Sequence, residues 1–260
     1  MAVAFEHLQV EEALPTVVVT LNRPDKLNAL SVDLMEELTA ELEELGRRDD
    51  VHVIVLRGAG RAFSAGHDLQ ELVDRTLAEE RETFKVCERL MATVQSIPQP
   101  VIASVHGIAT AAGCQLVASC DLAIASSEAR FATNGIRNGI FCYTPMVPVS
   151  RAIGRKRALE MVLTGNFIDA ATAERWGLVN RVVAPEQLDA AVMELAGQIG
   201  SLSQLAVRTG KAAFYQQVEL PQGPAYGLMT EAIASNATSE DAQEGMSAFL
   251  QKRKPIWKGR

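Results

Sequence analysis

Apolar residues occur in two kinds of pattern along the first 200 residues, short continuous runs and longer stretches at helical spacing. The short runs predict buried strands at 16–21, 51–58, 101–107, 121–126, 130–133 and 178–183. Helical spacing predicts helices over 31–46, 70–95, 108–120, 155–163 and 170–176. Because strands and helices alternate, the sequence predicts an α/β fold with largely parallel sheets.

The pattern changes after Pro185, from where it is helical almost to the end of the chain. We therefore expect two parts, an α/β core over residues 1–200 and a C-terminal helical region over residues 201–260. No segment repeats at a fixed period, and no low-complexity stretch separates the two parts.

Composition and charge exclude several classes of protein. The chain has 260 residues, of which 48% are hydrophobic and 22% charged, and its net charge is −7. An acidic chain of this kind does not bind nucleic acid through a global basic field. The acidic start does not predict a secretory signal. The apolar stretch 101–125 contains His106, Gln115 and Asp121, so we expect no membrane insertion.

The four cysteines and four histidines match no metal-ligand spacing, so we expect no metal site. A disulfide framework is unusual at this length, which favours a reducing compartment. We expect the cytoplasm, or the mitochondrial matrix after removal of a transit peptide.

Three local features resemble a dinucleotide-binding loop, a nucleophile elbow and a catalytic histidine, but each matches the known pattern poorly. In GAGRAF (58–63), Phe63 stands where a dinucleotide-binding loop has its third glycine. In AFSAG (62–66), Ala62 replaces the first glycine of a nucleophile elbow, and no base or acid is apparent. His106 lies within a predicted apolar strand, where a hydrogen-bonded core histidine is the commoner case.

Two loop–helix junctions are more informative as a pair. FSAGHDL (63–69) and GIATAAGCQL (107–116) both place small residues after a buried strand and before a helix-like stretch. Small residues let the backbone approach a ligand, and the first N–H groups of a helix lack intrahelical partners. If the junctions face each other, two N–H donors form the geometry of an oxyanion hole. Tight helix–strand packing explains the same residues equally well.

Seven blocks, in a common order and spacing, make the chain similar to the crotonase superfamily, the enoyl-CoA hydratase/isomerase family. This resemblance covers nearly the whole sequence. It implies a ClpP-like spiral of ββα units, with a C-terminal helical region that assembles subunits into a homotrimer or a dimer of trimers. The blocks are RPDKLNALS (23–31), GRAFSAGHDL (60–69), PVIASVHGIATAAGCQLVASCDLAIAS (100–126), FATNGIRNGIF (131–141), RALEMVLTG (157–165), AERWGLVNRVV (173–183) and EGMSAFLQKRK (244–254).

The resemblance also implies an acyl-CoA thioester as ligand and no separate cofactor. It assigns the oxyanion hole to the backbone N–H groups of His67 and Ala112. Lys252 matches a lysine that reaches the CoA phosphates from a neighbouring subunit, although its local sequence alone indicates a solvated basic tail. The other positions that match the CoA and acyl site are Lys26, Leu27, Ala29, Ala65, Gly66, Asp68, Leu69 and Gly113.

The chain departs from the family pattern at two positions. Hydratases of the family carry two glutamates twenty residues apart, and here Gln115 and Gly135 stand at those positions. An amide can orient a water molecule but is no base near neutral pH, and glycine offers only backbone. Ordinary hydratase activity is therefore expected to be absent or slow. If Gly135 holds a positive φ, a glutamate there would be strained.

Three functional interpretations remain open. The first is an enzyme that stabilises an enolate of an acyl-CoA or enoyl-CoA, the second a non-catalytic acyl-CoA carrier or sensor, and the third an assembly protein. A replacement acid or base is not identified by the sequence, and a buried, inert Cys142 is commoner than a nucleophile. The polar residues near the acyl end are Asn134, Cys142 and Tyr143, with Asp68 further out.

Overall fold

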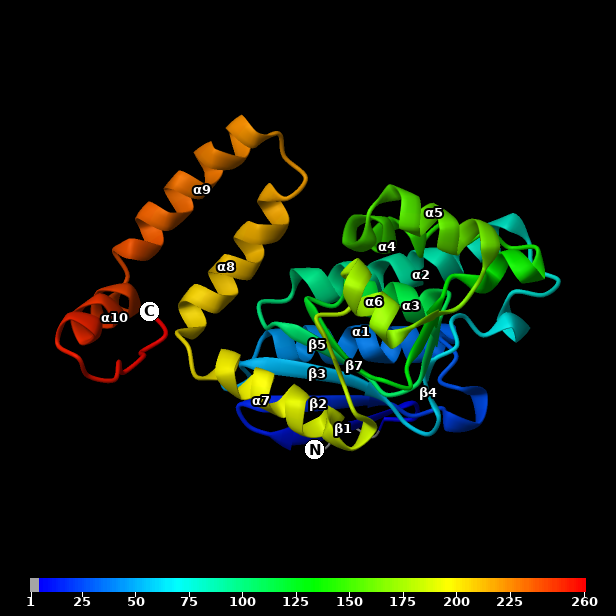
Figure 1. Ribbon diagram of the computed structural model, residues 1–260, viewed down its shortest axis with the longest axis horizontal. Helices are drawn as coiled ribbons and strands as arrows, with labels where there is room; N and C mark the ends of the chain where they lie inside the picture. The colour runs from blue at the N-terminus through cyan, green and yellow to red at the C-terminus, as the bar shows by residue number, and fades with distance from the viewer. Residues whose placement is uncertain (1–4) are drawn as a thin grey trace.

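Figure 1 shows the computed structural model, which describes residues 5–260. The larger of its two sheets contains β1 (Leu8–Ala13), β2 (Thr16–Leu21), β3 (Val53–Gly58), β5 (Val101–Val105), β7 (Leu122–Ser126) and β10 (Arg181–Val183); the smaller contains β4 (Ala62–Ser64), β6 (Ile108–Thr110), β8 (Arg130–Ala132) and β9 (Ile168–Asp169). The strand orders are β1-β2-β3-β5-β7-β10 and β4-β6-β8-β9. Neighbouring strands run parallel except β1 with β2 and β8 with β9.

Successive strands alternate between the two sheets along the chain. β3, β5 and β7 lie in the larger sheet, and each is followed by a strand of the smaller sheet, β4, β6 and β8. Helix α2 (Leu77–Ser96) follows the first pair, α3 (Ala112–Ser119) the second, and α4 (Met146–Ile153) and α5 (Arg155–Thr164) the third. These ββα units confirm the predicted α/β spiral, and their unequal connections explain the absence of a fixed sequence repeat.

The central strands of the larger sheet, β2, β3, β5 and β7, are buried on both faces. Val17 and Val19 of β2 pack in the same apolar cluster as α1 (Val32–Gly46), whereas Val18 packs against α7 (Leu188–Gly200) on the other side. All six residues of β2 are buried. A parallel strand covered on both faces needs no polar alternation, which explains the continuous apolar runs in the sequence.

The predicted helix over 70–95 is wrong at its start. Helix α2 begins at Leu77, where the Thr76 side chain accepts from the Glu79 N–H and the Glu79 carboxylate accepts from the Thr76 N–H. This reciprocal capping box defines the first turn. Residues Leu69–Glu71 form a separate short 3-10 helix, η2, next to the loop that follows β4.

The bounds of α1 and α6 (Ala170–Trp176) agree with the prediction, whereas those of α3 and β10 are shorter than predicted. Helix α1 begins after its predicted cap, Ser31, and α6 spans its predicted range. The predicted helix over 108–120 is wrong in its first residues, because β6 pairs with β8 and α3 begins only at Ala112. Within the predicted strand 178–183, only β10 pairs, with β7.

Strand β1 and helix α4 were not predicted. The start of the chain was interpreted only as acidic, and residues 1–4 lie outside the described part. Leu8 and Val10 alternate with polar residues in β1, which pairs with β2 along its whole length. Such alternation is the signal of an edge strand with one buried face.

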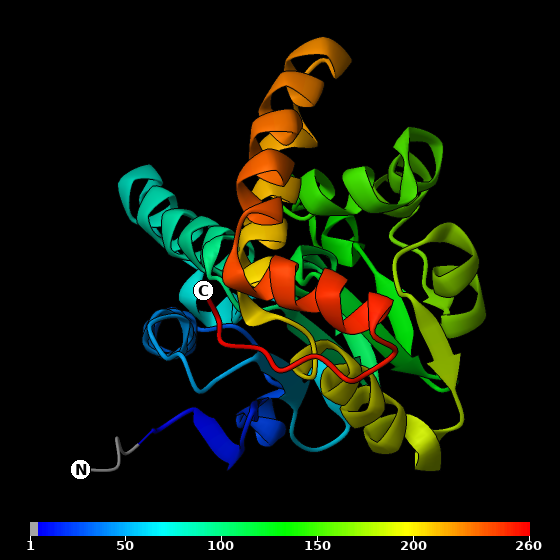
Figure 2. The same ribbon diagram turned by 90° about the vertical axis from the view of Figure 1, so that its left-hand side faces the viewer.

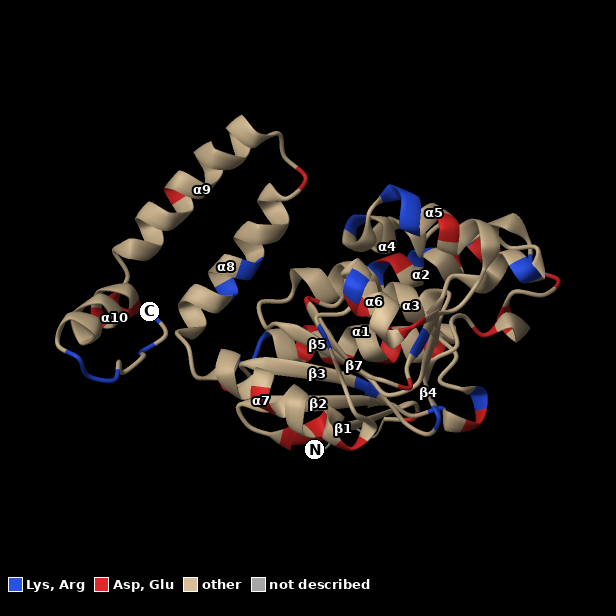
Figure 3. Cartoon of the chain, viewed as in Figure 1, with Lys and Arg blue, Asp and Glu red and all other residues tan. Residues whose placement is uncertain are grey.

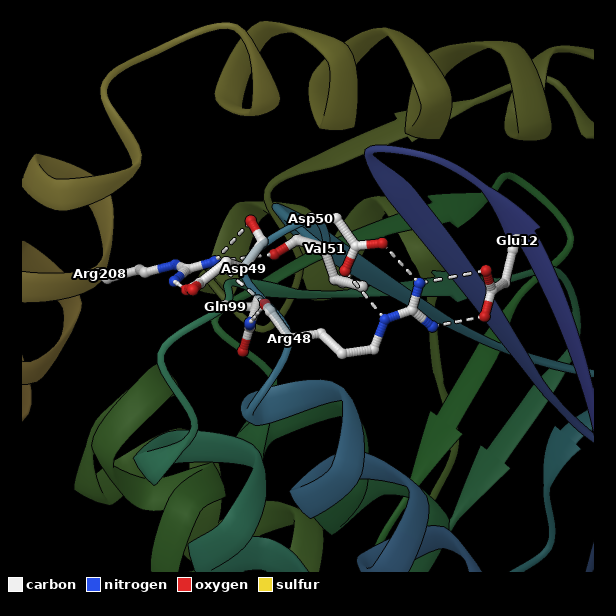
Figure 4. Close-up of polar contacts among 7 residues, drawn as sticks. All are labelled: Glu12, Arg48, Asp49, Asp50, Val51, Gln99 and Arg208. Carbon is white, nitrogen blue, oxygen red and sulfur yellow. Dashed lines mark hydrogen bonds and ion pairs between the residues drawn. The ribbon is translucent and has the colours of Figure 1, made fainter. Parts of the chain in front are cut away.

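Two basic side chains attach the C-terminal helices to the core. Arg208 of α8 (Gln204–Gln217) donates to the Asp49 carboxylate at 2.7 Å and to the Val51 carbonyl at 3.2 Å (Figure 4). Lys211, with a side chain only 6% exposed, donates to the Asp121 carboxylate at 2.7 Å. The helical region therefore joins the core through fixed contacts of α8. The division of the chain into a core over residues 1–200 and a helical region over residues 201–260 stays a prediction.

Helices α9 (Gln222–Ala237) and α10 (Glu240–Leu250) extend away from the sheets (Figures 1 and 2). Helix α9 has no buried residue, and Glu231 is the one charged residue in its sequence, so the helix is almost entirely tan in Figure 3. Tyr226 and Ile233 of α9 are 68% and 64% exposed. Within residues 5–260, no helix has the length and apolar character needed to cross a bilayer.

Candidate functional site

The two small-residue junctions predicted from the sequence lie in contact. The Thr110 hydroxyl donates to the Ala65 carbonyl at 3.0 Å. A Cβ atom at Gly113 would lie 2.3 Å from the Ser64 carbonyl oxygen, and one at Gly66 would lie 3.2 Å from the Ala112 nitrogen. Glycine at these two positions is what lets the loop after β4 pack directly on the start of α3.

Both junctions present backbone N–H groups. Leu30 donates to the Gly66 carbonyl at 2.7 Å and accepts from the Asp68 N–H at 3.2 Å, so the intervening His67 N–H points to the other side. Ala112 is the first residue of α3, where an N–H has no intrahelical partner. Within residues 5–260, neither the His67 N–H nor the Ala112 N–H donates to a protein acceptor.

An unusual backbone conformation precedes the second donor. Ala111 has φ 48° and ψ −118°, although positive φ is uncommon for residues other than glycine. Its N–H donates to the Ala132 carbonyl at 2.9 Å, which attaches this turn to the end of β8. Strained backbone of this kind persists only where the surrounding structure holds it.

The loop 23–31 covers the same edge of the site. The Ala65 N–H donates to the Leu27 carbonyl at 3.0 Å. Leu27 and Asn28 both have positive φ, and the fully buried Asn28 side chain donates to the Ala59 and Ala62 carbonyls at 2.8 Å each. These hydrogen bonds hold the loop 23–31 against the loop after β4. The residues predicted to face CoA therefore lie in one region: Lys26, Leu27, Ala29, Ala65, Gly66, Asp68 and Leu69.

Asp68 is engaged in structural contacts. One carboxylate oxygen pairs with Arg23 at 3.1 Å, and the other accepts the Gln70 N–H at 3.2 Å as the cap of η2. Lys26 reaches the Gln70 side chain at 3.3 Å. The sequence interpretation missed Arg23 as an Asp68 partner, although it opens the block RPDKLNALS.

Gln115 lies on the first turn of α3, buried and close to α2. Its side-chain oxygen Oε1 accepts a hydrogen bond from the Cys87 thiol, with a sulfur–oxygen distance of 3.9 Å. Its side-chain NH2 group donates to no residue within 5–260. Burial raises the pKa of Cys87 to about 12, so the thiol is a neutral donor. The His67 ring packs edge-on against Phe84, which lies in α2 as Cys87 does, and the two ring centroids are 5.2 Å apart.

The expectation that a positive φ explains glycine at position 135 is wrong. Gly135 does not have a positive φ. A Cβ atom there would lie 2.5 Å from the Ile140 carbonyl oxygen and 3.0 Å from the Cys142 sulfur. Its N–H donates to that sulfur at 3.3 Å. A side chain at 135 is therefore excluded by the returning segment 140–142, not by backbone strain.

The other polar residues predicted near the acyl end have no feature typical of a catalytic acid, base or nucleophile. Cys142 is 5% exposed, and burial raises the pKa of its thiol, as expected of an inert cysteine. Tyr143 is 67% exposed. Asn134 begins the 3-10 helix η3 (Asn134–Asn138). His106 lies just beyond β5, partly exposed, and bonds the Gly60 carbonyl at 2.9 Å, so it is no core residue.

Lys252 is not near this site in its own chain. It lies in the segment after α10, and α8 lies between that segment and β4 (Figure 1). Phe84, Cys87 and Thr133 were not predicted from the sequence, because only their spatial proximity to the junctions distinguishes them. Within residues 5–260, no three His, Cys, Asp or Glu side chains are grouped to hold a metal ion.

The sequence model of the enoyl-CoA hydratase/isomerase family matches residues 12–260. The chain belongs to this family. Enoyl-CoA hydratase domain-containing protein 3, mitochondrial, of Mus musculus is 45% identical over 240 residues, which cover 92% of this chain and 80% of the mouse protein. A probable enoyl-CoA hydratase of Mycobacterium tuberculosis, echA8, is 36% identical over 96% of this chain and 97% of its own length.

Solved structures of enoyl-CoA hydratase/isomerase proteins share the whole fold. The crystal structure of human enoyl Coenzyme A hydratase domain-containing protein 3 superimposes with a TM-score of 0.95 at 42% identity, covering 97% of this chain and 100% of the human one. An enoyl-CoA hydratase from Mycobacterium smegmatis gives the same TM-score at 45% identity, covering 97% and 99% of the two chains. The family membership thus rests on both sequence and structure.

Proposed function

We propose that this protein binds an acyl-CoA or enoyl-CoA thioester and polarises its carbonyl with the N–H groups of His67 and Ala112. The observation that carries the proposal is the contact between the two junctions, each contributing an N–H without a protein acceptor within residues 5–260. Fixed donors of this kind stabilise the negative charge that develops on a thioester oxygen when the neighbouring carbon loses a proton.

Hydration by the usual pair of carboxylates is not part of this proposal. Gln115 has an amide at one position, and Gly135 has no room for a side chain at the other. Asp68 pairs with Arg23 and caps η2. We therefore infer that crotonyl-CoA is hydrated at least about 10³-fold more slowly than by a relative with two glutamates.

The same absence of carboxylates favours a second candidate, a non-catalytic carrier or sensor of acyl-CoA. The two candidates are distinguished by incubating the protein with a panel of acyl-CoA and enoyl-CoA thioesters and following binding and turnover together. Micromolar binding with no turnover of any thioester supports the carrier. Conversion of one of them supports the enzyme.

Substitution of Ala112 tests the proposed donor directly. Ala112→Pro removes one N–H at the first helical position, where no intrahelical hydrogen bond is lost. We expect acyl-CoA affinity to fall about tenfold, as for loss of one hydrogen bond, while affinity for free CoA stays the same. Arg155→Pro, at the first position of α5, is the matched control. Unchanged acyl-CoA affinity in a folded Ala112→Pro protein would contradict the role of this N–H.

Assembly and location are part of the same proposal. The exposed apolar residues of α9 and α10 support a homotrimer or a dimer of trimers, in which Lys252 reaches the CoA phosphates of a neighbouring subunit. The four cysteines are free and buried, which is compatible with a reducing compartment. We place the protein in the cytoplasm or, like the mouse relative named mitochondrial, in the mitochondrion.

A further inference from the structure

A pocket of about 450 Å³ lies at the carboxyl ends of β2, β3 and β5, on the face of the larger sheet that α7 covers. Small-molecule sites commonly have volumes of about 300–1,000 Å³ and lie at this end of parallel strands. Strand β1 and the start of α7 complete its walls. No residue assigned to the acyl-CoA site lines this pocket, so a ligand there would occupy a separate site.

The floor of the pocket is a row of polar side chains on an otherwise apolar sheet face. Thr20 pairs with Gln9 on one side and with Arg57 on the other. Ser104 of β5 continues the row. Because Thr20 and Ser104 are only 4% and 3% exposed, this is a buried face, where polar residues are the exception. Two residues earlier in the same parallel strands, the side chains are apolar and belong to the cluster that packs against α7: Val18, Val55 and Ile102.

Part of the hydrogen-bonding capacity of this row is unused. Arg57 donates through Nε to the Thr20 hydroxyl at 2.9 Å and through Nη2 to the Glu11 carboxylate at 2.7 Å. Within residues 5–260, Arg57 Nη1 and the Ser104 hydroxyl have no protein partner, and both residues line the pocket. A guanidinium and a hydroxyl both donate to a carboxylate, and such charge-assisted bonds are the stronger ones. The floor therefore suits the carboxylate of a ligand.

The wall that α7 and the turn before it contribute is acidic. Glu186 of η4 (Pro185–Gln187) and Asp189 in the first turn of α7 both line the pocket. Within residues 5–260, neither carboxylate has an ion-pair partner, whereas Glu11 pairs with Arg57. The two negative charges repel a simple anion and attract a cationic group. A ligand that satisfies both the floor and this wall therefore carries charges of both signs.

We propose that this pocket binds a small zwitterion with a carboxylate and an ammonium group, such as an amino acid. The carboxylate lies at Arg57 and Ser104, and the ammonium group lies at Glu186 and Asp189. A carboxylate alone leaves the acidic wall unpaired, and an amine alone leaves the floor donors without an acceptor. The inference does not rest on the proposed function, because the two sites use different residues.

One segment connects the pocket with the proposed acyl-CoA site. Residues 58–60 line the pocket. The buried Asn28 side chain, from the loop predicted to face CoA, donates to the Ala59 carbonyl at 2.8 Å. Because the residues predicted to face CoA do not line the pocket, both ligands are expected to bind at the same time. Acyl-CoA should therefore leave the zwitterion bound, which separates the two sites experimentally.

Calorimetry with small charged probes tests the inference. The probes are 4-aminobutyrate, which has both charges, butyrate and butylamine, which have one each, and glycine and 6-aminohexanoate, which vary the charge separation. We expect the zwitterion of best-fitting length to bind at least about tenfold more tightly than butyrate or butylamine, the gain of one charge-assisted hydrogen bond. Arg57→Gln should lower zwitterion affinity about tenfold without weakening butylamine, whereas Asp189→Asn should weaken both. Arg47→Gln, at an arginine that pairs with Glu44 on the surface, is the matched control and should change neither.

Three results overturn the inference and leave the proposed function in place. They are equal affinity for the zwitterions and the singly charged probes, no binding of any zwitterion at millimolar concentration, and displacement of the zwitterion by acyl-CoA. Displacement would mean that the probe occupies the acyl-CoA site. If Arg57→Gln does not fold, Ser104→Ala removes a floor hydroxyl without changing the charge and is expected to weaken the zwitterion but not butylamine. An unchanged ratio of these two affinities would then overturn the inference.

Discussion

At the scale of single residues, the close contact between the two junctions depends on Gly66. Its φ of 94° is strained for any side chain, and a Cβ atom would lie 2.8 Å from the Ala111 Cβ and 2.9 Å from the Thr110 carbonyl oxygen. We expect Gly66→Ala to lower the free energy of unfolding by roughly 2 kcal/mol or more, and to weaken acyl-CoA binding. Urea unfolding and calorimetry measure the two effects.

Gly210 provides the control for this prediction. It lies in α8, and a Cβ atom added there would have nothing within 4 Å among residues 5–260. Gly210→Ala should stabilise the protein by up to about 1 kcal/mol, since alanine loses less backbone entropy in a helix. Similar effects of the two substitutions would show that the packing at Gly66 is less tight than the distances indicate.

A second prediction concerns the positions of the two family glutamates. Gln115→Glu places a carboxylate beside the proposed thioester site and should raise the slow hydration of crotonyl-CoA. Adding Gly135→Glu should give no further gain and should lower the melting temperature, because its Cβ meets the Ile140 backbone at 2.5 Å. Initial rates and thermal unfolding of Gln115→Glu and of the double variant measure this. A double variant faster than Gln115→Glu would mean that the segment 140–142 moves readily.

The buried His67 ring predicts a pH dependence of stability. Burial lowers its pKa to about 4, from 6.5 in an unperturbed histidine. Between these values the unfolded chain binds a proton that the folded protein does not. The free energy of unfolding therefore falls as the pH drops from about 6.5 to 4, by roughly 2–3 kcal/mol from this residue. Urea unfolding at several pH values should show a shallower fall for His67→Phe, and parallel curves would contradict the assignment.

The residues of the site were predictable to different degrees. The two junctions were predictable because small residues between a strand and a helix are a local pattern, whereas only the resemblance to the family assigned the donors to His67 and Ala112. The lack of room for a side chain at Gly135 was not predictable, because Ile140 and Cys142 approach this position from a loop that returns to it. His67 Nε2 and Thr133 Oγ1 likewise become conspicuous only when the packing shows that they have no partner among residues 5–260.

At the scale of elements, α8 depends on one buried ion pair. Lys211 donates to Asp121 at 2.7 Å and to the Val94 and Gln99 carbonyls at 2.9 and 2.8 Å, while the Tyr215 hydroxyl donates to Asp121 at 2.9 Å. Burial raises the pKa of Asp121 and lowers that of Lys211, each opposed by the partner's charge. Lys211→Met leaves the Asp121 carboxylate buried with its cationic partner removed.

We expect Lys211→Met to lower the free energy of unfolding by about 3 kcal/mol, the cost typical of a buried charge that loses its partner. Lys85→Met is the control, since Lys85 pairs with Glu82 on the exposed face of α2 and its loss should change little. Chemical denaturation measures both. A small effect of Lys211→Met would indicate that Tyr215 and the Val101 N–H suffice to hold Asp121.

Elements with strong local signals were predicted well, and those defined by pairing were not. Ser31 and the leucine spacing predicted α1, and continuous apolar runs predicted β2 and β3. β6 and β9 are two or three residues long and exist because a neighbouring strand pairs with them. Their sequences alone carry too few positions to show a period of two.

At the scale of the whole molecule, α8 lies between the segment after α10, which carries Lys252, and the elements of the proposed site, β4 and α3 (Figure 1). The proposed contact of Lys252 with CoA phosphates therefore requires another copy of the chain. The helices that carry it expose large apolar side chains, among them Phe249 at 82% and Leu250 at 80%. Exposed apolar surface of this kind is typical of surfaces that are covered on assembly. The assembly and the CoA site are thus predicted to depend on each other.

A thermodynamic cycle tests this dependence. Lys252→Ala should weaken acyl-CoA binding by roughly 1 kcal/mol, about fivefold, as expected for a solvated charge contact. Tyr226→Glu with Ile233→Glu places charges on the exposed apolar side of α9 and should give monomers in sedimentation at micromolar concentration. The unsubstituted protein is expected to sediment as a trimer or hexamer. In those monomers Lys252→Ala should have no further effect on affinity, because the lysine no longer reaches a site. The same fivefold loss in the monomer would place Lys252 at its own chain's site, and an unsubstituted protein that sediments as a monomer would contradict the assembly itself.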